Sequence, residues 1–175
     1  MINDLTASDS GSIPILTLLN LSAAFDTIDH SILLTSVEST FGIRDLALSF
    51  FRSCLQDRTQ AVTVTGIKFS PSLLTYGAPQ GSVLGPILFI LYTRPLSDVI
   101  SHHSVSHNLF AGDTKLYKSD FPSEAFTLSR TIEACISDVE VWVVQNKLQL
   151  NNDEREILLV GSALGIDFPS SVRVG

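Results

Sequence analysis

The segment from Phe110 to Tyr117, Phe-Ala-Gly-Asp-Thr-Lys-Leu-Tyr, constrains the fold more than any other part of the chain. An apolar run from Asn108 reaches a Gly-Asp pair, and an alternating run leads away from it. Two β-prone runs joined in this way predict a β-hairpin with Asp113 at its tip. A carboxylate held rigidly at such a tip suits Mg²⁺, which prefers oxygen ligands. Because Asp is also an ordinary turn residue, both interpretations stay open at this point.

The rest of the chain predicts a mixed α+β domain over residues 13–161, with no clear structure in 1–12 and 162–175. The apolar run Ile13 to Leu21 is typical of a strand that is buried on both faces. Asp29 is a candidate N-cap for the first helix. Helices are expected over about 29–41, 44–55, 83–100 and 123–146, and further hairpins over 60–75, turning at Gly66, and 148–160, turning at 151–153.

Composition limits the partners of the chain. The 175 residues are 45% apolar and 17% charged, with a formal net charge of −7. An acidic chain is a poor autonomous binder of nucleic acid, because phosphate contacts need a basic surface. The apolar excess predicts surface that a protein partner covers.

An intracellular location, in the cytoplasm or the nucleus, is expected. Cys54 and Cys135 belong to no Cys-x-x-Cys pattern and are interpreted as buried thiols in a reducing compartment. The first residues are polar and predict no signal peptide. The longest apolar stretch, 83–92, is too short to span a membrane.

Three blocks, in this order, resemble the palm domain of a reverse transcriptase (an RNA-directed DNA polymerase), most closely that of LINE-like non-LTR retrotransposons. The first block runs from Leu19 to Leu34 and begins Leu-Asn-Leu-Ser-Ala-Ala-Phe-Asp-Thr. The second runs from Tyr76 to Phe89 and begins Tyr-Gly-Ala-Pro-Gln-Gly-Ser. The third is the hairpin from Phe110 to Tyr117. The second block, placed between the other two, makes the resemblance specific.

The resemblance implies a fold and an activity. The fold is a palm-like antiparallel sheet with helices packed on one face, here with fingers and thumb largely absent. The activity is template-directed DNA synthesis on RNA by two-metal phosphoryl transfer, with an RNA template and a DNA primer as partners. Two Mg²⁺ ions held about 4 Å apart activate the primer hydroxyl and neutralise the leaving group, and carboxylates hold such ions.

The chain departs from the family pattern at two of the three acids that bind metal. Asn20 stands where the family has the first Asp, and Gly112 stands where the first hairpin Asp belongs. Asp113 is the remaining catalytic and metal-binding acid. Asp26 and Asp29 are expected to serve the following turn and helix, not to replace the missing acids. The sequence therefore predicts that Mg²⁺ binding is doubtful and catalysis is lost.

The resemblance also implies substrate contacts. Phe25 occupies the position of an aromatic residue beneath the incoming sugar, although core packing is the plain alternative. Gln80 and Gly81 match a turn that contacts substrate. Glu154 stands where the family often has a Lys that assists the departure of pyrophosphate.

Two other functions stay open beside the inactive polymerase palm. One is a non-catalytic module that binds nucleic acid or protein through the palm surface. The other is a relic of a transposon without a selected role.

Overall fold

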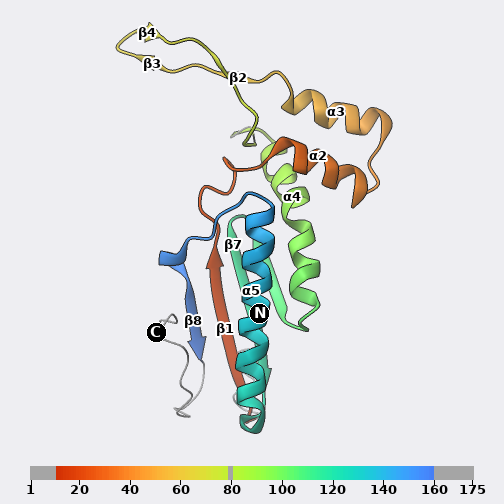
Figure 1. Ribbon diagram of the computed structural model, residues 1–175, viewed down its shortest axis with the longest axis vertical. Helices are drawn as coiled ribbons and strands as arrows, with labels where there is room; N and C mark the ends of the chain where they lie inside the picture. Colours follow the sequence, from red (N-terminus) through yellow and green to blue (C-terminus); the bar gives the residue numbers. More distant parts are fainter. Residues whose placement is uncertain (1–10, 79–80, 160–175) are drawn as a thin grey trace. The chain divides into compact units, whose positions relative to one another are not determined.

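The structure, a computed structural model, describes residues 11–78 and 81–159 and comprises two compact units (Figure 1). One unit combines the N-terminal segment up to Ser22 with the chain from Leu96 onward. The other unit runs from Ala23 to Pro95. The single domain expected over residues 13–161 stays a prediction.

The first unit is built on a four-stranded antiparallel sheet in the order β6-β7-β1-β8. Strand β1, whose sequence IPILTLLN is almost continuously apolar, lies inside the sheet. The expected burial of both faces is only partly met: Ile15, Thr17 and Leu19 are buried, whereas the side chains at 16 and 18 are half-buried. Helix α5 packs against β7 and lies along the strands in Figure 1. The predicted α+β class with an antiparallel sheet is confirmed. The elements are β1 (Ile13–Asn20), β6 (Ser106–Phe110), β7 (Asp113–Asp120), β8 (Glu156–Leu159) and α5 (Ala125–Gln145).

Helix α5 supplies much of the core of this unit. It follows a short 3₁₀ turn, η2 (Pro122–Glu124), and its buried side chains recur every three or four residues, as a helix that covers a sheet requires. Burial raises the pKa of the Cys135 thiol to about 11, so this thiol stays protonated. The buried residues of α5 are Leu128, Ile132, Cys135, Ile136, Val139, Trp142 and Val143.

The second unit contains α2 (His30–Ser39), α3 (Asp45–Leu55) and the part of α4 (Leu84–Ser101) that precedes Leu96. Asp29 caps α2 as expected, because its Oδ1 accepts the Ser31 N–H at 2.9 Å and the Ile32 N–H at 3.1 Å. These bonds satisfy two backbone donors that the first turn of a helix leaves unpaired. The start of α2 is therefore fixed by the sequence Asp29-His30-Ser31.

The start of α4 also follows its sequence. The Ser82 Oγ accepts the Gly85 N–H at 3.1 Å, and Pro86 falls in the first turn, where a missing N–H costs nothing. Pro95 lies inside the same helix. Within the described ranges, no helix combines the length and the hydropathy that crossing a bilayer requires.

A two-stranded ribbon extends from α3 within the second unit (Figure 1). Its strands are β2 (Thr59–Gln60), β3 (Thr63–Val64), β4 (Ile67–Lys68) and β5 (Ser72–Leu73), with β2 paired to β5 and β3 paired to β4. The tip is Thr65-Gly66, with φ of 48° and 83°. Positive φ at both positions matches the right-handed twist of the strands, so the predicted turn at Gly66 is confirmed.

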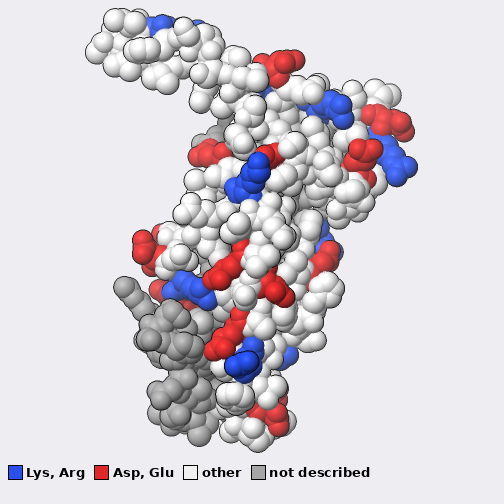
Figure 2. Space-filling model, viewed as in Figure 1, with Lys and Arg blue, Asp and Glu red and all other residues white. Residues whose placement is uncertain are grey.

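One face of this ribbon is apolar and exposed. Val64 lies opposite Ile67, and the Phe69 N–H donates to the Val62 carbonyl at 2.9 Å, so these four side chains share one face. Their exposed fractions are 61% for Val62, 52% for Val64, 66% for Ile67 and 57% for Phe69. Figure 2 shows few charged atoms over the ribbon. We call these four residues the ribbon patch.

The hairpin expected over residues 148–160 is wrong. Leu150 forms an isolated bridge to Leu21, and β8 pairs with β1, so both segments lie along β1 and not against each other. The 3₁₀ turn η3 (Asn152–Glu154) separates them. The apolar strand β1 offers a longer pairing surface than a short local hairpin, and it takes both segments.

Gly77 forms hydrogen bonds with the segment at Ile28 and His30 in the second unit. Its N–H donates to the Ile28 carbonyl at 2.8 Å, and its carbonyl lies 2.9 Å from Nε2 of His30. Its φ is +87°, and a Cβ at this position would lie 3.2 Å from the carbonyl oxygen of Asp26. Both the conformation and the space therefore favour glycine.

We predict that Thr17→Val stabilises the protein. Thr17 is fully buried in β1, and within the described residues its hydroxyl has no hydrogen-bond partner. An unsatisfied buried hydroxyl costs about 1–3 kcal/mol, so the isosteric Val should raise the free energy of unfolding by about 1 kcal/mol in a urea titration. Thr93→Val is the matched control, because the buried Thr93 hydroxyl donates to the Phe89 carbonyl at 2.9 Å. The control should lower stability, and equal effects of the two changes would contradict the argument.

We also predict that Gly77→Ala destabilises more than Gly66→Ala. Both glycines have positive φ, but a Cβ at Gly66 meets nothing within 4 Å, whereas at Gly77 it meets the backbone of Asp26. The strain of φ costs about 1 kcal/mol at either position, and displacement of the Asp26 backbone should add about 1 kcal/mol or more at Gly77. Thermal unfolding of the two variants measures the difference. Equal losses would show that the close approach to Asp26 has no energetic weight.

Candidate functional site

The three positions that the sequence assigns to metal binding lie together at one end of the β1–β7 pair. Asn20 is the last residue of β1 and lies directly opposite Asp113, the first residue of β7. The Leu21 N–H donates to the Gly112 carbonyl at 2.9 Å. The register of two antiparallel strands thus brings residues 20, 112 and 113 to one edge.

The predicted hairpin is present, but its turn lies one residue earlier than expected, so Asp113 is not at the tip. Phe110 lies opposite Asp113, so Ala111 and Gly112 form a two-residue turn between β6 and β7, with φ of 49° at Ala111. Asp113 is exposed and opens β7. Gly112 contributes no side chain, and its carbonyl accepts the Leu21 N–H.

Asn20 has a second neighbour that sequence reasoning did not place there. The Asn20 Nδ2 donates to Oε2 of Glu154, the last residue of η3. The Asn20 carbonyl accepts the Asn151 N–H at 2.7 Å, which holds the residue before η3 against the end of β1. The expected turn at residues 151–153 was the relevant signal, but its attachment to β1 depends on tertiary pairing that no local pattern encodes.

The donor set at this edge does not fit two Mg²⁺ ions. The positions that the family uses offer one carboxylate, from Asp113, and one neutral amide, from Asn20. The carboxylate of Glu154 also lies here, but its Oε2 accepts the Asn20 Nδ2. Nowhere in residues 11–78 and 81–159 do three or more His, Cys, Asp or Glu side chains gather in a group that could hold a metal ion. A pair of divalent cations needs several carboxylate oxygens to compensate its charge.

Phe25, one of the predicted substrate contacts, has a structural role in the second unit. Its ring stacks on Phe89 of α4 with centroids 4.8 Å apart, and its carbonyl accepts the Ala78 N–H at 2.8 Å. The ring is half-buried, so packing accounts for part of its surface. Its role as a gate beneath the sugar stays a prediction.

The other two predicted contacts lie in the loop before α4. Gly81 has a φ of +76°, and a Cβ there would meet nothing within 4 Å. The positive φ favours glycine here, and contact of Gly81 with substrate stays a prediction. Gln80 lies outside the described residues.

Tyr92 of α4 holds the segment that precedes α2. Its hydroxyl accepts the Asp29 N–H at 3.3 Å. Burial raises the pKa of Tyr92 to about 12, so this hydroxyl stays neutral.

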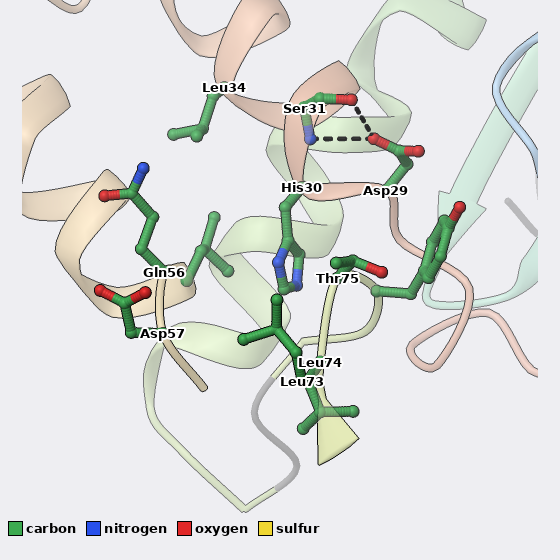
Figure 3. Close-up of a pocket in the computed structure, with 11 residues that line it drawn as sticks. Asp29, His30, Ser31, Leu34, Gln56, Asp57, Leu73, Leu74 and Thr75 are labelled. Carbon is green, nitrogen blue, oxygen red and sulfur yellow. Dashed lines mark hydrogen bonds between the residues drawn. The ribbon is translucent and has the colours of Figure 1, made fainter. Parts of the chain in front are cut away.

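A hollow of about 670 Å³ lies in the second unit, between the start of α2, the end of α3 and the segment after β5 (Figure 3). Two of its polar groups already serve the fold: the Asp29 Oδ1 caps α2, and the His30 Nε2 contacts the Gly77 carbonyl. None of the predicted site residues that the structure describes lines it. Its lining comprises Asp29, His30, Ser31, Leu34, Leu55, Gln56, Asp57, Leu73, Leu74, Thr75 and Tyr76.

Comparison with known proteins agrees with the arrangement of the three blocks. A sequence model of the family described as "Reverse transcriptase (RNA-dependent DNA polymerase)" matches residues 3–167. A probable RNA-directed DNA polymerase from transposon BS of Drosophila melanogaster is 27% identical over 139 residues, which are 76% of this chain and 15% of that protein. The RNA-directed DNA polymerase from mobile element jockey of Drosophila funebris is 35% identical over 161 residues, 89% of this chain and 16% of that protein.

The fold has a solved counterpart. A structure titled apo telomerase from Candida tropicalis, truncated from its C-terminal domain, matches with a TM-score of 0.67 at 16% identity. The match covers 94% of this chain and 34% of that one. The resemblance to polymerases of LINE-like non-LTR elements is confirmed by the similar polymerases of mobile elements. Because the family sequence model matches residues 3–167, the chain belongs to the reverse transcriptase family.

Proposed function

We propose that this chain is the palm of a non-LTR retrotransposon reverse transcriptase and that it has lost nucleotide transfer. The family reaction is DNA synthesis on an RNA template from a DNA primer, with Mg²⁺. The single observation that carries the proposal is the edge of the β1–β7 pair, where Asn20 lies opposite Asp113 and Gly112 precedes it. The chain spans 15% and 16% of the length of two related polymerases, so activity and substrates belong to this proposal.

The transition-state stabilisation that two carboxylates would provide is large enough to support loss of activity. If each missing carboxylate contributes about 3–4 kcal/mol to stabilising the transition state, two together are worth a factor of about 10⁴–10⁶ in rate. The Asn20 amide replaces neither the charge nor the second oxygen of a carboxylate. Asp113 is the one acid at the metal positions of the family, and the Glu154 carboxylate nearby is engaged by the Asn20 amide.

A second candidate function is that of a binding module whose partner is a protein. The ribbon patch favours it, because Val62, Val64, Ile67 and Phe69 expose apolar surface on one face of a two-stranded ribbon. Such a ribbon is marginally stable alone and gains stability when its apolar face is covered. The net charge of −7 disfavours nucleic acid as the main partner.

An intracellular location is part of the proposal. Cys54 and Cys135 are both free thiols, as is usual in a reducing compartment.

We predict that the purified chain and its Asp113→Ala variant give the same signal in a primer-extension assay with Mg²⁺ or Mn²⁺. Removal of Asp113 should not change the rate of nucleotide incorporation, because the proposed site no longer holds two metal ions. The substitution should leave folding intact, since Asp113 is exposed. Template-dependent incorporation that disappears in Asp113→Ala would overturn the proposed loss of activity.

A gain-of-function variant tests the same site from the other side. Gly112→Asp places a second carboxylate beside Asp113 and should tighten Mn²⁺ binding, followed by electron paramagnetic resonance, by about tenfold or more, because each added carboxylate supplies charge and oxygen ligands. Ser70→Asp, which adds the same charge at an exposed position of the ribbon with no acid next to it in the sequence, should leave the affinity unchanged. Equal gains in both variants would mean that general charge, and not the hairpin tip, controls the binding.

A further inference from the structure

We infer that Asn20 and Glu154 form a matched pair: the carboxylate of Glu154 suits an amide at position 20 and would conflict with an acid there. The inference concerns the chain's own contact at the end of β1. The contact between the two side chains is observed in the structure and does not depend on the proposed function. Only its consequence for catalysis rests on that proposal.

The backbone brings Glu154 to this place. The Ser22 N–H donates to the Gln149 carbonyl at 2.8 Å, and the Asn151 N–H donates to the Asn20 carbonyl at 2.7 Å. The Glu154 N–H then donates to the Asn151 carbonyl at 3.2 Å and closes η3. Since none of these bonds uses the side chains of Asn20 and Glu154, the two positions meet whatever residues occupy them.

In this hydrogen bond the Asn20 amide is the donor and the Glu154 carboxylate is the acceptor. An ionised carboxylate only accepts hydrogen bonds, so the Asn20 amide must turn its Nδ2 toward Glu154. A hydrogen bond to a charged acceptor is stronger than one between neutral groups. With an aspartate at position 20, two acceptors of the same charge would face each other with no proton between them.

The pairing constrains position 20. The donor is on the strand, at Asn20, and the acceptor carboxylate is on the turn, at Glu154. An acid at position 20 would therefore conflict with Glu154.

A double-mutant cycle on the full chain tests the coupling. Asn20→Asp alone should lower the folding equilibrium constant about three- to tenfold in urea titrations, because the new carboxylate meets both Glu154 and Asp113, which lies opposite it. Only the part that Glu154→Gln restores belongs to the pair. Glu154→Gln alone should lower it by less. When Asn20→Asp is already present, however, adding Glu154→Gln should raise it, because the Gln amide donates to the new carboxylate. This reversal of sign is the expected result, and additive effects would overturn the inference.

The NMR signals of the Asn20 side-chain amide report on the contact directly and independently of stability. In ¹H–¹⁵N spectra, Glu154→Gln should shift the Asn20 NH₂ signals, since it removes their charged acceptor. Asp153→Asn is the matched control, because it removes the same charge from the neighbouring residue of η3 and should leave these signals in place. Signals that respond equally to both changes would also overturn the inference. No metal, primer or nucleotide is present, so the outcome is independent of whether the chain proves inactive.

Discussion

The pairing of β1 with β7 is the constraint on which the rest of the first unit depends. Strand β1 pairs without interruption, from Ile13 opposite Asp120 to Asn20 opposite Asp113. The burial of Ile15, Thr17 and Leu19 on one side of β1 fixes this register, because a slip by one residue would turn that set to the other face. The register decides which residues meet at the end of the strands. The site is thus a by-product of core packing along the whole length of β1.

Local patterns predicted those elements whose ends are set by short-range chemistry. Asp29 as an N-cap, the turn at Gly66 and the hairpin between Phe110 and Asp113 are all visible in the sequence, because a cap or a two-residue turn needs particular side chains at particular places. The segment after Asn146 was not predictable in this way. Residues near Leu150 and in β8 have ordinary strand composition, and they could pair with each other or with β1. The choice depends on the apolar surface of a strand that is distant in the sequence.

The candidate site also contains parts that the sequence predicts and parts that depend on tertiary pairing. The family blocks identified residues 20, 112 and 113, and the structure brings them together. The contact between Asn20 and Glu154 could not be predicted, since it follows from the attachment of η3 to β1. In the second unit, Gly77 joins the segment at Ile28 to the start of α2 by main-chain and His30 contacts. Part of the block that resembles a substrate turn therefore also has a structural task, and its composition reflects both demands.

The main-chain bond from Leu21 to Gly112 has a consequence for how such a chain changes over time. It joins the two strands at their tips through peptide groups alone, and Asn151 is joined to Asn20 in the same manner. The shape of this edge therefore does not depend on acidic side chains or on ions between them. Side chains at Gly112 and Asp113 can therefore vary with little cost to folding, whereas the buried Ile15 and Leu19 cannot. The architecture of this edge is maintained by its main chain and by the core of β1, separately from the chemistry that its side chains can carry.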